Sequence, residues 1–332
     1  MKILLSIFFV LQTVSSQVEF YGKSYIVYDH INDYVVESYQ KDHQQSVASI
    51  SKIMTAILVI ENMDLKKEIV VDDTINKAYG SCVYIHIKDR ITIQDLLYGL
   101  MLRSGNDCAL MLAKATAGSV SKFVKMMNEK AQQLKMYNSL FSNQSGLDEE
   151  DQGNLSTVQD MAILYDYCSS NPIFNQIVAT KEYRRLDGQG YWHNKNRLLK
   201  EYKYCVGGKT GFTKKARRTL VTRAVKDQYD LIIVTFNCGN DFEFHKGKYE
   251  ECFDKYKQLT LFDKGVQTIA GQKYLFDEPY QVDYQQDKKV SYRVDRDVLC
   301  LYVDHHCIKK TKLRPYHFKD LWVMVMKDLL DV

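Results

Sequence analysis

Several features are scarce in this 332-residue chain, and each absence narrows its class. Only three residues are Pro, and no internal repeat or low-complexity tract is present. The 45 Lys and Arg nearly balance the 41 Asp and Glu, and the resulting net charge of +4 argues against a dedicated nucleic-acid-binding protein. No segment beyond the amino terminus has about 18 uninterrupted apolar residues, so we expect no transmembrane helix. The hydrophobic fraction of 45% is ample for a packed core, which excludes a disordered chain.

The amino terminus is typical of a secretory signal peptide. Lys2 precedes an apolar run from Ile3 to Leu11, and Val14 and Ser16 are small enough for the positions before a cleavage site. The run is too short to span a bilayer, and the alternative interpretation is a buried first strand. We expect residues 1–16 to be removed and the mature protein to be exported.

The mature chain has helical periodicity in its middle and strand patterns at both ends. Short β-rich runs flank the turn residues Asn32-Asp33, and two more strands are expected near residues 219–225 and 231–237. Helical spacing of apolar residues covers 51–62, 92–102, 108–117, 121–136 and 157–168. This order predicts an α+β fold, in which an antiparallel sheet packs against a helical cluster.

The composition changes near Lys264-Gly265, which suggests a second unit. We expect residues 17–262 to form the α+β domain, residues 263–315 a small β module, and residues 316–332 an amphipathic helix. That helix is suited to the interface of a membrane and equally to docking on its own protein, so both interpretations stay open.

The eight cysteines do not define a disulfide framework, because the chain is not small. Export permits disulfides, yet Cys108 and Cys168 lie in expected helices and suit buried packing. Cys205 and Cys238 are the candidates to meet across neighbouring strands.

The first candidate for chemistry is Ser49-Ile50-Ser51-Lys52, at the start of the helix expected over 51–62. The i, i+3 spacing places the hydroxyl and the ammonium on one helix face. A lysine in a dry site can lose its charge and take the serine proton, and the helix amino terminus offers N–H groups to an oxyanion. The S-x-x-K pattern also occurs at 38–41 and 119–122, so alone it is a weak signal.

Two further motifs follow in the chain. Ser104-Gly105-Asn106 supplies a hydroxyl and an amide from one turn, although the same pattern recurs at 169–171. Lys209-Thr210-Gly211 occurs once, where a positive charge beside a hydroxyl suits a substrate carboxylate. Each motif alone is equally consistent with an ordinary turn.

The order of the three motifs is that of penicillin-binding proteins and class A β-lactamases. The surrounding sequence resembles the low-molecular-mass penicillin-binding proteins, the serine D-alanyl-D-alanine carboxypeptidases of peptidase family S11, over residues 22–260. The matching segments are VASISKIMTA (47–56), DLLYGLMLRSGND (95–107), FSNQSGL (141–147), STVQDMA (156–162) and GGKTGFT (207–213). Val47, Gln144-Ser145 and Gly207 depart from the residues usual in that family. The resemblance implies a β-lactamase/transpeptidase-like fold.

The resemblance also implies a mechanism. Ser49 would attack the carbonyl between the two D-alanines of a peptidoglycan stem peptide, with Lys52 as its base. Ser104 would relay a proton to the leaving amine, and Asn106 would hold a substrate amide and Lys52.

The third motif would recognise the end of the substrate. Lys209 and Thr210 would bind the terminal carboxylate, Gly211 would allow close approach, and the N–H groups of Ser49 and Phe212 would form the oxyanion hole. β-Lactams would acylate Ser49. We expect no metal and no organic cofactor, a location at the cell wall or the outer face of the cytoplasmic membrane, and peripheral membrane contact only through the C-terminal helix.

Three alternatives stay open. A D,D-endopeptidase acting on peptidoglycan cross-links would use the same residues. A β-lactamase would also need a carboxylate for its deacylating water, and the E-x-x-L-N stretch that usually supplies it is absent. A non-catalytic wall-binding protein would keep the fold but would not need the intact motifs.

Overall fold

The computed structural model describes residues 18–148, 153–186, 188, 190–317 and 320. The expected signal peptide and nearly all of the expected C-terminal helix lie outside the described residues. Within the described part, no helix is both long enough and apolar enough to cross a bilayer.

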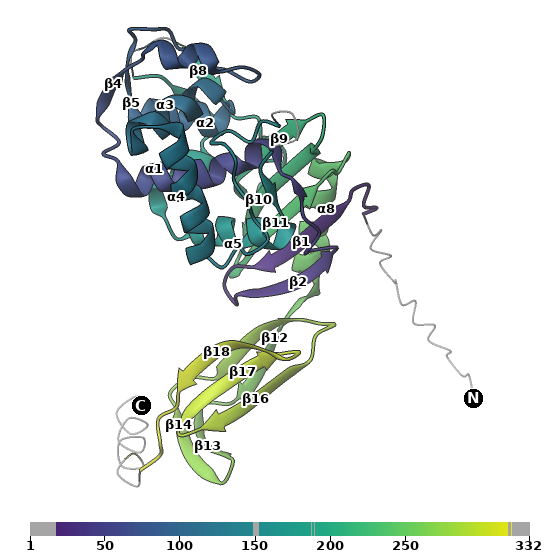
Figure 1. Cartoon of the computed structure of the whole chain (residues 1–332). Helices are drawn as coiled ribbons and strands as arrows, with labels where there is room; N and C mark the ends of the chain where they lie inside the picture. Colours follow the sequence, from purple (N-terminus) through teal and green to yellow (C-terminus); the bar gives the residue numbers. More distant parts are fainter. Residues whose placement is uncertain (1–17, 149–152, 187, 189, 318–319, 321–332) are drawn as a thin grey trace, which may run out of the picture.

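A five-stranded sheet in the order β2-β1-β11-β10-β9 forms the centre of the larger part of the molecule (Figure 1). Every neighbouring pair is antiparallel. The strands are β1 (Ser24–Asp29), β2 (Tyr34–Tyr39), β9 (Cys205–Thr213), β10 (Arg217–Lys226) and β11 (Tyr229–Phe236). The strand β9, which carries the Lys209-Thr210-Gly211 motif, is therefore an edge strand.

Both faces of this sheet are covered, because apolar side chains from its strands belong to a core on each side. Ile232 and Val234 of β11 pack with the helical cluster on one face of the sheet. Leu231 and Ile233 pack on the opposite face with helix α8 (Asp241–Lys255). The short helix α7 (Leu198–Glu201) adds Leu198 and Leu199 to this second core. The cluster on the first face contains α1 (Lys52–Asn62), α2 (Ile93–Leu102), α3 (Asn106–Ala117), α4 (Val120–Gln133), α5 (Val158–Ser169) and α6 (Pro172–Ala179).

Short elements join these layers and surround the site. They are the 3₁₀ turns η1 (Ala48–Ser51) and η2 (Asp73–Lys77), and the strand pairs β3 (Gln45–Ser46) with β6 (Leu155–Ser156), β4 (Glu68–Val70) with β5 (Arg90–Thr92), and β7 (Glu182–Arg184) with β8 (Tyr191–His193). The structure confirms the α+β fold, the β1–β2 hairpin at Asn32-Asp33 and the five expected helices, each within three residues at its boundaries.

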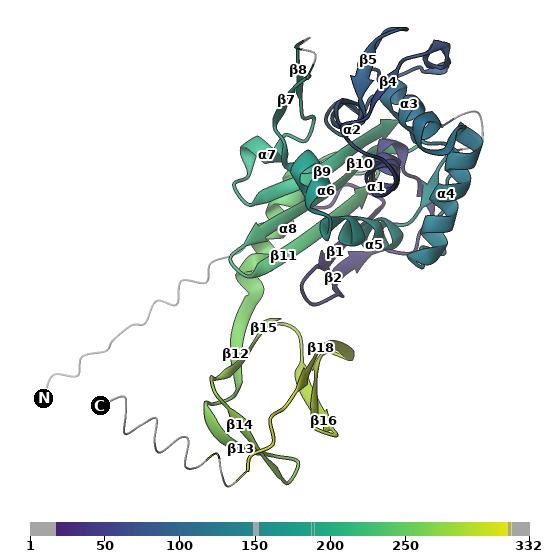
Figure 2. The same ribbon diagram turned by 90° about the vertical axis from the view of Figure 1, so that its left-hand side faces the viewer.

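The carboxy-terminal part is all β and lies beyond α8 (Figure 2). Its strands are β12 (Tyr256–Phe262), β13 (Gly265–Ile269), β14 (Gln272–Phe276), β15 (Tyr280–Gln285), β16 (Val290–Asp295), β17 (Val298–Val303) and β18 (His306–Lys312). β12, which pairs with β15, begins at Tyr256, before the expected boundary at residue 263. Phe262 packs in a core of this part, whereas Tyr256 packs in the core of the larger part, so the division of the chain at residue 263 stays a prediction. The composition change at Lys264-Gly265 marks the turn between β12 and β13. Independent folding of this part stays a prediction.

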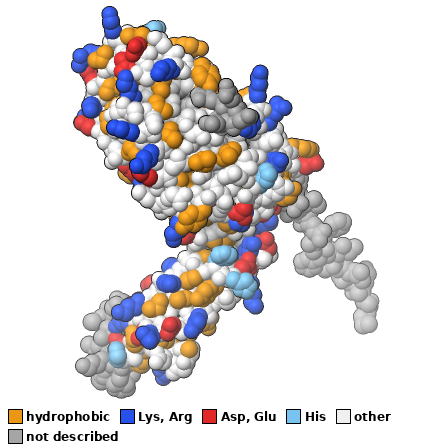
Figure 3. Space-filling view, in the orientation of Figure 1, with side chains coloured by type: hydrophobic (Ala, Val, Ile, Leu, Met, Phe, Trp, Pro, Cys, Tyr) orange, Lys and Arg blue, Asp and Glu red, His pale blue; other side chains and the backbone are white. Residues whose placement is uncertain are grey.

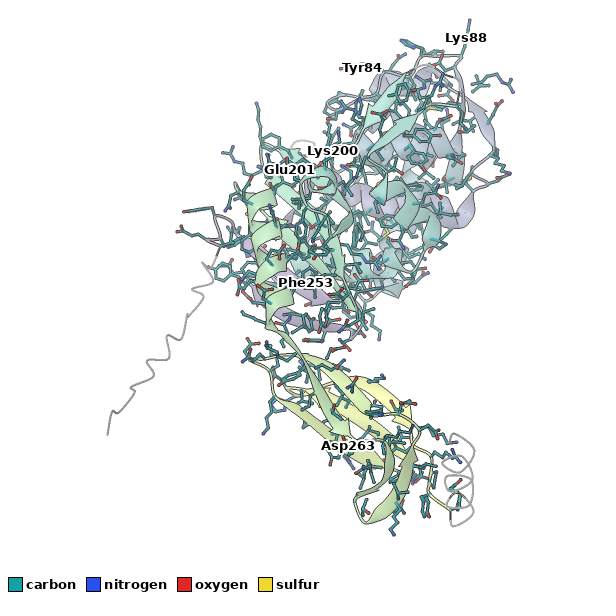
Figure 4. The ribbon with its side chains drawn as sticks, turned by 180° about the vertical axis from the view of Figure 1, so that it is seen from behind. Tyr84, Lys88, Lys200, Glu201, Phe253 and Asp263 are labelled. Atoms are coloured by element: carbon teal, nitrogen blue, oxygen red, sulfur yellow. The ribbon has the colours of Figure 1, made fainter. Side chains whose placement is uncertain are left out.

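The surface matches the near-neutral charge. Basic and acidic side chains are interspersed on the face in Figure 3, on both the larger part and the β-rich part. From behind, Figure 4 places Phe253 of α8 on the larger part, Asp263 in the β-rich part, and Tyr84 and Lys88 at the far end of the molecule.

All eight cysteines lie in the described part, and all are free thiols. The expected pairing of Cys205 with Cys238 is wrong, because Cys205 lies on β9, Cys238 follows β11, and β10 separates those strands. Cys108 and Cys168 are fully buried in helices, as expected.

Because all eight cysteines are free thiols, the number that react with a thiol reagent can be predicted. Native protein should react first at exposed Cys307 and more slowly at half-buried Cys82 and Cys300, while five buried thiols stay protected. Denatured, unreduced protein should titrate all eight with Ellman's reagent. A count of six or fewer in denaturant would mean that a disulfide had formed.

Candidate active site

The nucleophile segment enters helix α1 through a tight 3₁₀ turn. Ala48, directly before Ser49, has a φ of 51°, which is uncommon for a residue with a side chain. Gly146 packs against this turn so closely that a Cβ there would lie 1.9 Å from the Ala48 carbonyl oxygen. The 142–147 loop therefore holds the turn, and with it Ser49, in place.

Lys52 lies one helical turn after Ser49 and is completely buried. Its Nζ is 3.0 Å from Ser49 Oγ, 2.8 Å from Asn106 Oδ1 and 2.5 Å from the Ser145 carbonyl oxygen. A neutral amine has two N–H groups and one lone pair. With the N–H groups on the Asn106 and Ser145 oxygens, the lone pair faces the Ser49 hydroxyl, which is the arrangement of a base beside a nucleophile.

The environment favours that neutral amine. Burial lowers the pKa of Lys52 to about 7, and the positive charge of Lys195 adds to the effect. An ordinary lysine is almost entirely protonated at neutral pH, whereas a group with a pKa near 7 is available as a base.

The second motif forms the turn between α2 and α3. Ser104 has a φ of 64° and only 4% of its surface is exposed. Asn106 begins α3, where its backbone N–H donates to the Ser81 carbonyl oxygen (2.7 Å) and its Nδ2 donates to the Tyr79 carbonyl oxygen (2.6 Å). Both sides of the Asn106 amide are thus engaged, one by Lys52 and one by the 78–81 segment.

The third motif lies on β9, opposite the first two. Lys209 is 1% exposed, and its Nζ donates to Ser104 Oγ (3.0 Å) and to the Thr210 carbonyl oxygen (2.7 Å). Burial lowers the pKa of Lys209 well below its usual range, and the charges of Lys52 and Lys195 add to this. The structure therefore joins the three motifs through two buried lysines.

Gly211 allows β9 to approach the nucleophile turn. A Cβ at this position would lie 2.4 Å from Thr219 Oγ1 and 3.0 Å from the Ser49 backbone nitrogen. The Thr219 hydroxyl in turn donates to the Val47 carbonyl oxygen (3.0 Å), so strand and turn are held together. The neighbouring Phe212 side chain is 61% exposed at the rim.

A cavity of about 320 Å³ opens onto these groups. Its lining includes Ser49, Ser104, Thr210, Gly211 and Phe212. Of the eight residues expected from the sequence, five line this cavity, and Lys52, Asn106 and Lys209 are hydrogen-bonded to the lining residues Ser49, Ser81 and Ser104 respectively.

Two cations at this cavity were missed by the sequence analysis. Lys195 lines it and donates to Ser81 Oγ (3.2 Å). Arg218 lines it too, with its Nε and Nη2 on the two oxygens of buried Asp241 (3.1 and 2.5 Å). Neither has a diagnostic spacing in the sequence, because a lysine in a loop and an arginine on a strand are normally solvent-exposed charges.

Within the described ranges, no three His, Cys, Asp or Glu side chains are grouped to hold a metal ion. The site is that of a serine acyl-transfer enzyme, with a serine beside a buried lysine of lowered pKa and a second lysine–serine pair across the cleft.

Comparison with known proteins identifies the family. Residues 11–240 match the D-alanyl-D-alanine carboxypeptidase family, peptidase S11. A D-alanyl-D-alanine carboxypeptidase of Bacillus subtilis is 29% identical over 271 residues, covering 78% of this chain and 69% of that protein. A D-alanyl-D-alanine endopeptidase of Haemophilus influenzae is 30% identical over 258 residues, covering 76% and 87%.

The fold agrees. The crystal structure of penicillin-binding protein 5 from Haemophilus influenzae superposes with a TM-score of 0.72 over 90% of this chain and 98% of that one, at 20% identity. The chain belongs to the D-alanyl-D-alanine carboxypeptidase family, whose members are serine hydrolases.

The bonds of Asn106 predict a structural role that can be measured without substrate. Asn106→Leu keeps the size but removes the acceptor of Lys52 and the donor to Tyr79, so it should destabilise the fold by about 1–3 kcal/mol in urea unfolding. Asn76→Leu, at an exposed position of η2, is the control and should change stability little. Equal midpoints for the two variants would contradict the prediction.

Proposed function

We propose that this enzyme cleaves the bond between the two D-alanines of peptidoglycan stem peptides through an acyl-enzyme on Ser49. The observation on which this rests is the 3.0 Å contact of Ser49 Oγ with the buried Lys52 amine, whose pKa is about 7. Lys52 takes the hydroxyl proton as Oγ bonds to the carbonyl carbon. The backbone N–H groups of Ser49 and Phe212 receive the oxyanion.

The leaving D-alanine needs a proton on its amine. Ser104 faces the cleft and accepts from Lys209, so it can pass its hydroxyl proton to that amine and regain one from Lys209 Nζ. The C–N bond breaks, D-alanine departs, and water then hydrolyses the Ser49 ester. Asn106 holds Lys52 throughout and presents its amide to the acyl part of the substrate.

The terminal carboxylate is recognised by more groups than Lys209 and Thr210. Lys209 Nζ is buried and already donates to two oxygens, so it acts mainly through its charge and through Ser104. Lys195 lines the open cavity and supplies positive charge where the carboxylate enters, whereas Arg218, which lines it too, is already paired with Asp241, another residue of the lining. Thr210 contributes its hydroxyl.

We also propose that the protein is exported and works at the cell wall. The apolar run at residues 3–11 and the site of action of peptidoglycan enzymes support export. Contact of the segment 316–332 with the membrane rests only on its amphipathic pattern.

The endopeptidase alternative uses the same residues on a different bond. In a cross-link, the leaving amine belongs to a neighbouring stem peptide and still has a carboxylate beside it. The cations Lys195 and Arg218 at the cavity are therefore compatible with endopeptidase activity too. Release of D-alanine from monomeric muropeptides, compared with cleavage of cross-linked dimers, separates the two activities. The β-lactamase alternative requires rapid turnover of penicillin, and the non-catalytic alternative requires none.

Covalent labelling tests the acyl-enzyme. Wild-type protein should bind a fluorescent penicillin irreversibly in denaturing gels with slow release, and Ser49→Ala should not bind it. Ser51→Ala is a matched control, because its hydroxyl donates to the Ala48 carbonyl oxygen and not to Lys52. Labelling of Ser49→Ala at the wild-type level would refute Ser49 as the nucleophile.

The pKa of Lys52 predicts the pH dependence of acylation. Lys52 is a base only when unprotonated, so the second-order rate with penicillin should rise tenfold per unit below about pH 7 and level off above it. Lys52→Arg stays charged and should lose about 10²–10⁴-fold in rate. A rate that is flat between about pH 5.5 and pH 8.5, which is the pKa ± 1.5, would show that Lys52 is not the base.

A further inference from the structure

The Asp148 carboxylate connects two segments that carry groups of the active site. Asp148 directly follows the 142–147 loop. Its Oδ1 accepts from the Ser46 hydroxyl (2.6 Å), and its Oδ2 accepts from the Thr213 hydroxyl. Ser46 lies on β3, shortly before the nucleophile turn, and Thr213 is the last residue of β9. One carboxylate therefore joins the strand that leads into the nucleophile turn to the strand that carries the third motif. No step proposed above uses it.

Second contacts fix the geometry of this link. The Ala216 backbone N–H donates to Thr213 Oγ1 (3.0 Å), so the hydrogen of that hydroxyl is left for Asp148. Gly153 approaches the same carboxylate so closely that a Cβ there would lie 2.2 Å from Asp148 Oδ1. A hydrogen bond from a hydroxyl to a carboxylate is also roughly twice as strong as one between neutral groups. Asp148 is therefore a fixed link between the two strands.

The oxyanion hole depends on how far apart the two segments are held. Its proposed donors, the N–H groups of Ser49 and Phe212, lie on the nucleophile turn and on β9, and they are effective only when both point at the oxyanion. One tie on the turn is the bond from Thr219 of β10 to the Val47 carbonyl oxygen. The other is the pair of hydroxyl bonds to Asp148. Of these two ties, only the second ends on β9, at the residue next to Phe212.

We infer that Asp148 is a positioning residue for the oxyanion hole. By accepting from the Ser46 and Thr213 hydroxyls, it sets the spacing between the two N–H groups of the hole. Its side chain does not line the cavity at Ser49, so it acts through these hydroxyls and not on the substrate. The inference rests on the proposed function, because an oxyanion forms only when Ser49 Oγ bonds to a carbonyl carbon. Such positioning stabilises the transition state and leaves substrate binding unchanged.

The test separates acylation by penicillin into a binding constant and a limiting rate constant, measured by stopped flow at increasing penicillin concentration. Asp148→Asn replaces one of the two acceptor oxygens by a donor. It should lower the limiting rate about 10- to 100-fold, less than the roughly 10²–10³-fold lost with a whole oxyanion donor. The binding constant should stay that of wild type. The pH midpoint should not move, because the contacts of Lys52 are kept. A loss confined to the binding constant, or a shifted midpoint, would overturn the inference.

Asp160→Asn is the matched control. Asp160 is also a buried carboxylate that accepts from a serine hydroxyl, that of Ser139 (2.7 Å), and it does not line the cavity either. This variant should lower the urea midpoint of unfolding and leave the limiting rate of acylation unchanged. If Asp160→Asn lost as much of the limiting rate as Asp148→Asn, the role of Asp148 would be structural only.

Variants at Thr213 test the inference even where Asp148→Asn does not fold. Thr213→Val keeps the shape but removes the hydroxyl, so it should lower the limiting rate about as much as Asp148→Asn, whereas Thr213→Ser should restore it. The two losses should be less than additive in the double variant, because both break one link. Full additivity, or equal rates for the Val and Ser variants, would contradict the role of Asp148.

The same measurements keep this inference apart from the proposed function. Wild type that is acylated by penicillin but releases no D-alanine from stem peptides would refute the proposed substrate. The limiting rates of acylation of the Asp148 and Thr213 variants would still decide whether Asp148 positions the oxyanion hole. Wild type that is not acylated at all would refute both.

Discussion

The burial of two lysines within one cleft is the constraint on which the site depends. Lys52 and Lys209 are almost completely inaccessible, and each ammonium would be very unstable there without oxygen acceptors. The acceptors come from parts of the chain that are far apart in sequence: Ser49, Asn106 and Ser145 for Lys52, and Ser104 and Thr210 for Lys209. The helical cluster, the 142–147 loop and the edge strand β9 must therefore all be in place before either lysine is stable.

The same constraint explains the unusual backbone around the site. Ala48 and Ser104 both adopt positive φ angles, one beside the nucleophile and the other beside the proton relay. Such conformations cost free energy and persist only where the surroundings impose them. The 142–147 loop imposes the first through the contact of Gly146 with Ala48, and α3 imposes the second by beginning at Asn106. The strain thus serves to aim two hydroxyls at two lysines.

Features of the fold that depend on nearby residues were predictable from the sequence, whereas features that depend on the pairing of distant segments were not. Helices such as 93–102 and 158–169 have local periodicity and an N-cap threonine, and both were found. The three motifs were found because their order is diagnostic. The strand β12, which begins at Tyr256, was not predicted, because its pairing with β15 is non-local and leaves no change in composition at that residue. The Cys205–Cys238 pairing failed for the same reason, since strand order in a sheet is not a property of either segment.

Lys195 and Arg218 show a further limit of prediction from sequence. Each is an ordinary polar residue in sequence, and its importance comes only from what the fold places beside it. Lys195 lowers the pKa of both buried lysines through space, although it makes no hydrogen bond to either. A carboxylate that enters the cleft beside Lys195 would offset that positive charge and raise the pKa of Lys52 and Lys209. A bound carboxylate would therefore reduce the fraction of Lys52 that is unprotonated, and so available as a base, at neutral pH. Arg218 changes this balance little, because its Nε and Nη2 already pair with Asp241.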